Sequence, residues 1–520
     1  MIKMIIKGKL RTLTAFHTGS GAAEFHTDMA LAKDGEGNYY IPGTTLAGAL
    51  RDYLNRSLGS YKAWYDATDE KEKQKLARKM PEDIIVKKLF GYQNNDDGHA
   101  SALLVEDAPA VGDVKVSVRD HVVIIRETGS AAPGLKFDRE VVQAGSEFAF
   151  RMEIDFKNME EKEQLLPYIG YLVQTLKNGD IRLGGATSRG LGAVKLHQIK
   201  IFEWDLTEKE NFEKFLQFQV NDNKIAPNVM LKNLPNPKKI NPEPFAVIKL
   251  KCGIEGPFMI KSGAVDESDY PNPSADEKIE APDMVCLRET NAFGEDVFVI
   301  PGSSIKGAFR AQAERIIKQC QGKNDSHRWL KPFKDDDGKV NLKKFGEYLK
   351  KRQERGIEPP EVESCFGDAE EGQGAFIFTD AYFEPKPDLT KVTNHVAIDP
   401  LTGGAIDSAL YSMDAIWDDE NAEFCMTLRV QRPELWQLGL LGHLLWDLHD
   451  GRIRLGFGKA RGMGRVKIKE INSIRGRLPE LTKKGEVVEF PITLTDEARH
   501  YLNELSDAFN KKMEEGRNNG

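Results

Sequence analysis

The sequence IPGTTLAGALR at residues 41–51 returns as IPGSSIKGAFR at residues 300–310. In both copies a proline and a glycine end an extended segment, because proline fixes φ and glycine accepts almost any backbone conformation. Small hydroxyl residues follow, and these are typical N-caps of helices. Apolar residues then recur every three or four positions, which predicts amphipathic helices over residues 45–58 and 304–320.

Four further landmarks recur in the same order around these two helices. They are DMALAKD and DMVCLRE before the helix, LFG and CFG after it, then VRDHVVIIRETG and VTNHVAIDPLTG, and finally IRLGGATSRGLGAV and IRLGFGKARGMGRV. A repeat of this kind indicates one structural unit that has been duplicated. We therefore expect the two halves of the chain to share a topology.

Within each half, the apolar patterns predict the order strand, helix, strand, strand, helix, strand. This is the order of a ferredoxin-like fold, which RNA-binding domains of the RRM type share. The predicted fold class is α+β, with two tandem ferredoxin-like domains. We place the first domain at residues 1–205, a linker at 206–244, the second domain at 245–490 with a helical insertion near 321–364, and a C-terminal helix with a frayed tail at 491–520.

The composition is that of an ordinary globular protein, with 40% hydrophobic and 30% charged residues. No apolar run is long enough to span a bilayer. Five cysteines lie far apart without a CxxC pair, which favours the reducing cytoplasm over a structural zinc site. The net charge of −8 argues mildly against a general nucleic-acid binder, but 73 Lys and Arg residues leave room for a basic face.

The helix starts and the glycine-rich loops are candidate phosphate sites. A helix N-terminus presents free N–H groups, and glycine lets backbone amides approach a phosphate closely. The glycine loop follows a helix and opens a strand, so it is not a Rossmann loop, and neither copy has the P-loop pattern. A tight turn explains one copy alone, whereas a basic residue at the same place in both favours phosphate contact. The candidates are Thr44, Thr45, Arg51, Ser303, Ser304, Lys306 and Arg310 at the helices, and Ser188, Arg189, Lys459 and Arg461 in the loops.

As an ordered set repeated twice, the aspartate loop, the IPG helix and the glycine loop resemble the RAMP superfamily, specifically the backbone subunits of type III CRISPR effector complexes. A fusion of two such units is similar to the double-backbone proteins of type III-D systems. The resemblance implies a chain that binds a CRISPR RNA guide through the helix starts and glycine loops. It also implies complementary single-stranded target RNA and other effector subunits as partners, including further RAMP backbone proteins and a large signature subunit, but no membrane.

The resemblance further implies a projecting β-hairpin, or thumb, in each unit, which displaces one base pair of the guide–target duplex. The thumbs would lie at residues 118–144 and 392–416. Beside each displaced nucleotide a loop aspartate would support cleavage of the target, and the matching residues are Asp28 and Asp283. His17 stands where the family often has a guide-contacting histidine, with Lys261 as its expected counterpart in the second unit.

RNA carries its own nucleophile, so its 2′-hydroxyl needs geometry and charge neutralisation more than a catalytic triad. Flipping a nucleotide out of the stack supplies that geometry. An exposed aspartate, with a reference pKa of about 3.9, is a poor general base at neutral pH but a good ligand for a hard cation. We therefore expect Asp28 and Asp283 to bind Mg²⁺ or Mn²⁺ weakly, together with waters and the substrate phosphate, and the products to carry a cyclic phosphate and a 5′-hydroxyl.

His121 and His395 occupy the same place in the two predicted thumbs. They could pack inside the hairpin, stack on a base, or act as a general base near neutral pH. Three functions stay open: a guided endoribonuclease that uses both aspartates, a non-catalytic guide-binding scaffold in the same complex, and a stand-alone RAMP endoribonuclease that processes the CRISPR transcript with His17 or His26. Duplication favours the first two, because a processing enzyme needs only one site.

Overall fold

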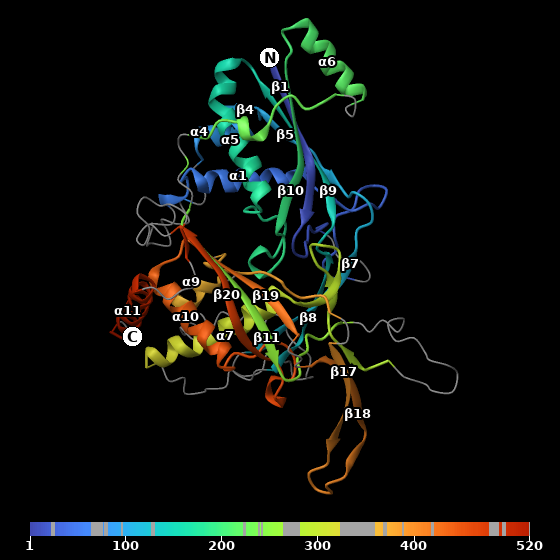
Figure 1. Cartoon of the computed structure of the whole chain (residues 1–520), viewed down its shortest axis with the longest axis vertical. Helices are drawn as coiled ribbons and strands as arrows, with labels where there is room; N and C mark the ends of the chain where they lie inside the picture. Colours follow the sequence, from blue (N-terminus) through green and yellow to red (C-terminus); the bar gives the residue numbers. More distant parts are fainter. Residues whose placement is uncertain are drawn as a thin grey trace, which may run out of the picture.

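The computed structural model describes residues 1–21, 27–63, 76, 82–94, 97–125, 130–221, 225–237, 240, 243–263, 281–322, 359–367, 372–386, 389–417, 421–477, 488–490 and 496–518. Two α+β units follow one another along the chain and lie one above the other (Figure 1). The predicted α+β class, with two units in tandem, is therefore confirmed. In this described part of the chain, no helix is long and apolar enough to cross a membrane.

The first unit is built on a four-stranded antiparallel sheet in the order β10-β1-β9-β5. Its elements are β1 (Ile2–Thr12), α1 (Gly43–Ser57), β5 (Leu103–Val105), β9 (Glu147–Phe156), α5 (Met159–Asn178) and β10 (Val194–Asp205). This is the ferredoxin-like arrangement, with both helices on one face (Figure 1). Alternate residues of β9, such as Phe148, Phe150 and Met152, are buried in the core, as the period of a strand requires.

The second unit repeats this core within a larger sheet of eight strands, ordered β13-β14-β16-β19-β11-β20-β21 with β15 beside β19. Its core elements are β11 (Phe245–Glu255), α7 (Gly302–Cys320), β15 (Phe376–Phe378), β19 (Glu423–Gln431), α10 (Leu435–His449) and β20 (Arg465–Arg477). The added strands are β13 (Arg288–Thr290), β14 (Asp296–Ile300), β16 (Ala381–Phe383) and β21 (Val488–Phe490). The order β20-β11-β19-β15 therefore matches the order β10-β1-β9-β5.

The LFG and CFG motifs end two short helices that the sequence did not predict. These are α4 (Ile84–Phe90) and α9 (Pro360–Phe366). Their terminal glycines, Gly91 and Gly367, have φ of 73° and 75°, a backbone region that favours glycine just after a helix. The motif thus marks a helix end in both units.

The expected linker is largely packed onto the first unit. It contains α6 (Lys209–Val220), whose Phe218 packs with Phe202 and Trp204 of β10. Further along, Leu231 and Leu234 contact the first core. Most of the predicted insertion near 321–364 lies outside the described residues.

The C-terminal helix α11 (Asp496–Asn518) buries Phe509 and Met513 against the second core. It is helical to Asn518, and the frayed tail stays a prediction.

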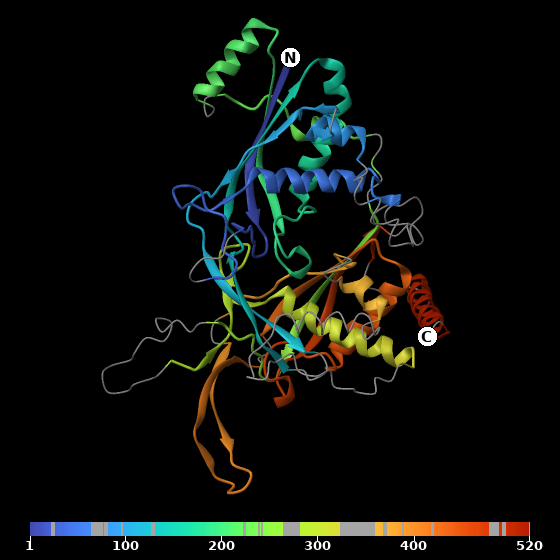
Figure 2. The ribbon, with the colours of Figure 1, turned by 180° about the vertical axis from the view of Figure 1, so that it is seen from behind.

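Both segments expected to project as thumbs form antiparallel hairpins. β7 (Val116–Ile125) pairs with β8 (Ser130–Val142), and β17 (Thr390–Ile398) pairs with β18 (Ala405–Ile416). The first hairpin reaches along the second unit, whereas the second hairpin projects from the molecule (Figures 1 and 2). That they act as thumbs stays a prediction.

A buried ion network holds the two units together. Arg119 of β7 donates to Glu289 of β13 at 2.7 and 2.5 Å and to Asp380 at 2.8 Å. The other oxygen of Asp380 accepts the N–H of Gly302, the first residue of α7, at 2.8 Å. Gly190 lies very close to Gly302, because a Cβ added at Gly302 would lie 2.7 Å from the Cα of Gly190. We call these five residues, Arg119, Gly190, Glu289, Gly302 and Asp380, the joint.

Arg119→Met should strongly destabilise the protein, because it leaves Glu289 and Asp380 as buried carboxylates without a cation. Removing one partner of a buried pair typically costs about 3–5 kcal/mol. Chemical unfolding of the full chain measures the loss. The control is Lys214→Met, since Lys214 is 52% exposed beside Glu210 and surface pairs contribute about 0–1 kcal/mol. Equal losses in the two variants would contradict the role of the joint.

Candidate functional site

The two aspartates predicted to be catalytic lie exposed on loops beside their own hairpins. The backbone N–H of Asp28 donates to Asp138 of β8, and that of Asp283 donates to Ser412 of β18. Bonds from the backbone and hydroxyl of Ser412 lower the pKa of Asp283, which therefore stays ionised at neutral pH. The structure thus places both acids at the same position of the repeated unit.

Within the described residues, no three His, Cys, Asp or Glu side chains gather as a metal site. Each acid loop offers exposed hard oxygen ligands from one or two side chains. This donor set fits Mg²⁺ or Mn²⁺ only where waters and a substrate phosphate complete the coordination shell.

The hairpin histidines stack on aromatic residues of the opposite strand. His121 lies 4.9 Å from Phe137 and His395 lies 5.2 Å from Tyr411, both with ring planes 17° apart. Burial, followed by the charges of nearby arginines, lowers the pKa of His121 to about 4. Of the three alternatives, this geometry matches packing within the hairpin and argues against His121 as a general base near pH 7.

The hydroxyls expected to cap the repeated helices do not do so. Thr44, Thr45, Ser303 and Ser304 lie in the first turns, and the N-cap residues are prolines without a side-chain cap bond. Asp107 instead accepts the N–H of Gly43 at 2.7 Å, as Asp380 does for Gly302. The sequence did contain a signal for these caps, because LLVEDA and FIFTDA place both aspartates at the same point of the repeat.

Arg51 and Arg310, predicted as RNA contacts, bind groups inside their own units. Arg51 pairs with both oxygens of Glu82 at 2.7 Å and donates to the carbonyl of Gly91 at 3.1 Å. Arg310 donates to the carbonyl of Gly367 at 2.6 Å. Each arginine therefore fixes its helix to the glycine of the LFG or CFG motif, and this geometry argues against a phosphate contact.

Ser188, Arg189 and Lys306 meet at the joint. The Nζ of Lys306 donates to the hydroxyl of Ser188 at 3.2 Å, and Lys306 is only 9% exposed. Burial, followed by the charges of Arg189 and Arg310, lowers the pKa of Lys306 to about 7. Two elements predicted to bind phosphate, one from each unit, thus come together.

Arg139 of β8 adds a third cation that the sequence did not indicate. It is buried, its guanidinium contacts the sulfur of Met29, and burial together with the charges of Arg189 and Arg119 lowers its pKa. We call Arg139, Arg189 and Lys306 the basic cluster. In the part of the chain that the structure describes, none of the three pairs with a carboxylate.

His17 is buried against the first glycine loop. Its Nδ1 lies 2.8 Å from the carbonyl of Glu140, and its own carbonyl accepts the N–H of Gly185. In the second unit the carbonyl of Met259 makes the equivalent bond to the second glycine loop. The pairing of His17 with Lys261 is therefore wrong. Burial lowers the pKa of His17, and a buried imidazole is poorly placed to process a transcript; His26 lies outside the described residues.

The remaining candidates belong to the second unit and are not part of the joint. Lys261 and Lys459 are exposed. Arg461 donates to the hydroxyl of Tyr411 at 2.7 Å, which ties the second glycine loop to its hairpin. Arg189 occupies the same loop position in the first unit, where Phe137 offers no hydroxyl, so its guanidinium lacks that bond.

The sequence analysis also missed the arginines that brace the glycine loops. Arg182 donates to the carbonyl of Leu191 at 3.2 Å, and Arg454 donates to that of Met463 at 3.3 Å. The repeated IRLG was the available signal. Both side chains therefore hold the shape of their loops.

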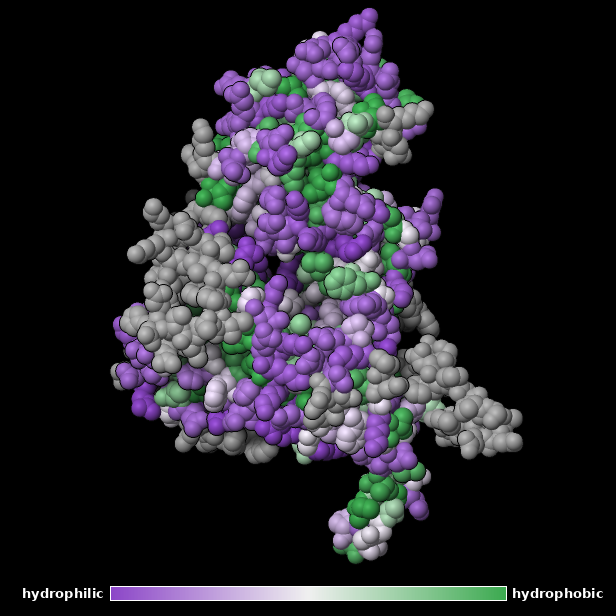
Figure 3. Space-filling view, in the orientation of Figure 1, coloured by the Kyte–Doolittle hydropathy of each residue, from purple (hydrophilic) through white to green (hydrophobic). Residues whose placement is uncertain are grey.

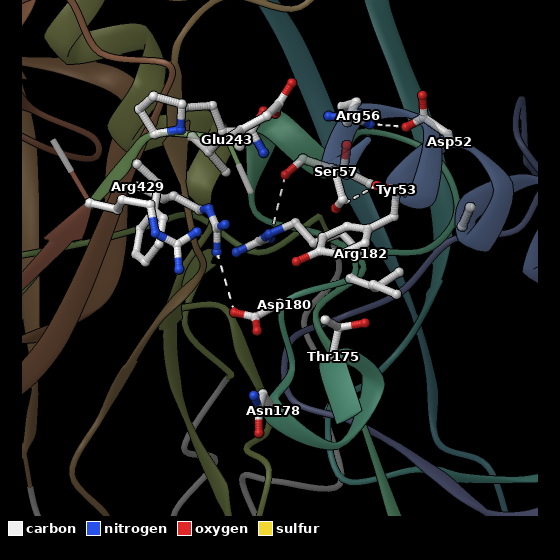
Figure 4. A pocket seen from close by; sticks show the side chains of 18 of the residues that line it. Asp52, Tyr53, Arg56, Ser57, Thr175, Asn178, Asp180, Arg182, Glu243 and Arg429 are labelled. Atoms are coloured by element: carbon white, nitrogen blue, oxygen red, sulfur yellow. Dashed lines mark hydrogen bonds and ion pairs between the residues drawn. The ribbon is translucent and has the colours of Figure 1, made fainter. Parts of the chain in front are cut away.

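A pocket of about 280 Å³ lies between the units beside the first glycine loop (Figure 4). Arg182 lines it together with Arg429, which lies 3.8 Å from Asp180. Burial, followed by the charge of Arg429, lowers the pKa of Arg182 to about 10. None of the site residues predicted from the sequence lines this pocket, so the candidate site lies elsewhere.

The projecting second hairpin carries apolar side chains that face solvent (Figure 3). They include Val392, Ile398 and Leu410, which are 50%, 55% and 69% exposed. Such a surface is typical of a segment that inserts into or packs against a partner.

Residues 9–195 and 291–467 match the model of the RAMP superfamily, one region in each structural unit. The matches cover most of the chain, which belongs to this superfamily and joins two RAMP units in one polypeptide. It is similar to the CRISPR system Cms endoribonuclease Csm3 of Methanocaldococcus jannaschii, with 26% identity over 212 residues. That alignment covers 38% of this chain and 80% of the relative.

His121→Gln should reduce the loss of stability in acid. The unfolded chain protonates this histidine near its ordinary pKa of about 6.5, whereas the folded protein resists protonation down to about pH 4. Stability therefore falls as the pH drops through this window. Because the side chain is only partly buried, we expect the variant to recover about 1–2 kcal/mol at pH 5.

Urea unfolding at pH 7.5 and pH 5 measures this difference. His395→Gln controls for the loss of a stacked imidazole in the second hairpin. An unchanged acid loss in His121→Gln would contradict the buried, neutral state of His121.

Proposed function

We propose that this chain is a cytoplasmic backbone subunit of a type III CRISPR effector complex, which binds a CRISPR RNA guide and cleaves complementary target RNA at two sites. The observation that carries the proposal is the basic cluster. Its cations come from both units, and mutual repulsion without a carboxylate favours an anion such as an RNA phosphate. Membership in the RAMP superfamily and the likeness to a CRISPR endoribonuclease support it.

The basic cluster and the first acid loop share a strand. Arg139 directly follows Asp138, which binds the loop of Asp28. The guanidinium of Arg139 also contacts Met29, the next residue of that loop. A guide phosphate at the basic cluster would therefore lie beside the elements that carry Asp28.

The hairpins have the surface expected of a wedge. Exposed apolar side chains at the second hairpin can stack on or separate bases, as apolar wedges do in other nucleic-acid complexes. A nucleotide displaced in this way would present its 2′-hydroxyl in line with the adjacent phosphate.

Cleavage would then be a transesterification. The 2′-oxygen forms a bond to the adjacent phosphorus while the bond to the 5′-oxygen breaks, and the proton of the 2′-hydroxyl passes through water to the leaving oxygen. The products carry a 2′,3′-cyclic phosphate and a 5′-hydroxyl. Asp28 and Asp283 would hold Mg²⁺ or Mn²⁺, which when bound neutralises the charge that develops on the phosphate.

Further RAMP subunits would be neighbours of this chain, besides the large signature subunit. Two residues that correspond to members of the joint, one in each unit, lack the contact that the joint makes, and this supports such neighbours. Asp107 corresponds to Asp380 but is exposed. Gly462 corresponds to Gly190, yet an added Cβ there would meet no atom of the described residues within 4 Å. The first unit thus presents the equivalent of Asp380, and the second unit presents the equivalent of Gly190. Each is one side of the contact that joins the two units of this chain.

Asp28→Ala and Asp283→Ala, made singly, should each remove one cut, since each variant lacks the carboxylate assigned to one site. We expect the affected cut to slow on the order of 100-fold or more, while the other cut and target binding stay unchanged. Single-turnover reactions of the assembled complex with end-labelled, guide-complementary RNA measure the cuts separately. Persistence of both cuts in both variants would leave the non-catalytic scaffold as the function.

Lys306→Met should weaken guide binding and flatten its pH dependence. A phosphate favours the charged form of Lys306, whose pKa is about 7 in the free protein. Binding therefore takes up a proton, and affinity falls as the pH rises from 6.5 to 8.5. In the variant this fall should shrink, and the salt slope should drop by roughly 0.7, the value for one phosphate on a single strand.

Fluorescence anisotropy with a labelled single-stranded guide measures both effects. The control is Lys214→Met, which removes an exposed cation from α6. If the two variants behave alike, the basic cluster does not hold the guide.

A further inference from the structure

Each acid loop is tied to its own hairpin by a reciprocal pair of hydrogen bonds. In the first unit the N–H of Asp28 donates to Oδ1 of Asp138 at 2.7 Å, and the N–H of Asp138 donates to Oδ2 of Asp28 at 3.1 Å. In the second unit the N–H of Asp283 donates to Oγ of Ser412 at 3.1 Å, and the N–H of Ser412 donates to Oδ2 of Asp283 at 2.7 Å. We call each pair a clamp.

The two clamps occupy equivalent places in the hairpins. Asp138 directly follows Phe137, the residue on which His121 stacks. Ser412 directly follows Tyr411, on which His395 stacks. The same reciprocal pair is therefore built twice, although one unit uses a carboxylate and the other a hydroxyl as the acceptor for the loop N–H. The hydroxyl of Ser412 also donates to Oδ2 of Asp283 at 3.1 Å, a bond that the carboxylate of Asp138 has no proton to make.

A clamp restricts the acid in two ways. The side chain of the hairpin residue fixes the loop backbone, and the N–H of that residue fixes one carboxylate oxygen. The second oxygen of each acid is not used by the clamp and stays available to a ligand. Since an exposed aspartate on an unrestrained loop samples several rotamers, this arrangement removes freedom that a cleavage reaction would otherwise have to remove.

We propose that Asp138 and Ser412 are positioning residues that hold Asp28 and Asp283 in register with their hairpins. The acid then moves with the hairpin, so the strand that displaces a nucleotide also delivers the carboxylate to the adjacent phosphate. This inference rests on the proposed function, because it concerns how the same acids act. The side chains of Asp138 and Ser412 serve the loop N–H and need not touch the RNA.

The chain supplies its own matched variants, because each unit shows a side chain that works in the other. Asp138→Ala and Ser412→Ala remove the acceptor for the loop N–H. Asp138→Ser and Ser412→Asp give each unit the residue type that the other unit uses, so both variants should keep an acceptor for the loop N–H. Asp120→Ala is the control, since Asp120 lies opposite Asp138 in the hairpin but pairs with Lys136 instead of the acid loop.

The first measurement is the single-turnover rate of each cut in the assembled complex, with the cuts assigned by Asp28→Ala and Asp283→Ala. Asp138→Ala should slow the cut of Asp28 between about 10-fold and 100-fold, and Ser412→Ala should do the same to the cut of Asp283. The other cut in the same complex serves as an internal control. The exchange variants should restore both rates to within about twofold, and target binding should not change.

The second measurement is hydrogen exchange of the free full-length chain. The amides of Asp28 and Asp283 should exchange faster in the alanine variants and stay protected in the exchange variants, whether or not the protein cleaves RNA. This readout also shows whether a slow variant has lost the clamp or the whole fold.

The outcomes separate this inference from the proposed function. If Asp28→Ala abolishes its cut while Asp138→Ala cleaves at the wild-type rate, positioning is overturned and the proposed function stands. If both aspartate variants still cleave at both sites, the proposed function fails first. If Asp138→Ser is as slow as Asp138→Ala, the hydroxyl does not replace the carboxylate and the equivalence of the two clamps is overturned.

Discussion

The contact between Arg119, Glu289 and Asp380 determines how the rest of this molecule is assembled. Three charged side chains are buried together, and such a group is stable only when its geometry satisfies all three. The same geometry presses Gly190 of the first glycine loop onto the start of α7. Because Gly190 has a φ of 113° and almost no room for a side chain, glycine is required there. The basic cluster forms at this contact, since Arg189 adjoins Gly190 and Lys306 lies one turn into α7.

The two units share a fold but carry different residues at equivalent positions. These differences make the two faces available to neighbouring subunits unlike each other. In the second hairpin, Thr393 stands where the first has Arg119, so the second hairpin cannot form the same ion network with Asp107 of another copy. Asp107 caps its helix with one oxygen, as Asp380 does, but it is exposed. A neighbour at that face would have to bring its own cation. This difference favours neighbours of different sequence over simple stacking of identical chains.

The repeat allowed the topology to be predicted, because strand and helix periods are local and were present twice. Contacts between distant segments could not be read from local patterns. The helix caps come from aspartates 64 and 78 residues away, and Arg119 reaches partners 170 and 261 residues away. A basic residue on a helix also looks the same whether it faces solvent or a carbonyl, which is why Arg51 and Arg310 were assigned to RNA. The pairing of His17 with Lys261 failed because FHTGSG and FMIKSG align residue for residue, which places Met259 opposite His17 and Lys261 opposite Gly19.

The joint and the first clamp connect the placement of the two units to the position of Asp28. Arg119 fixes the first hairpin to the second unit, and Asp138 of that hairpin holds the loop of Asp28. The position of the first acid therefore depends on the relative placement of two whole units. The second hairpin has no corresponding support among the described residues, since Thr393 replaces the arginine and the strands project into solvent (Figure 2). Joining the units in one chain raises their effective concentration for each other, so the first hairpin is braced before any partner arrives. The second hairpin is instead held within its own unit, where Arg461 donates to the hydroxyl of Tyr411 at 2.7 Å, so the two acids are supported in different ways.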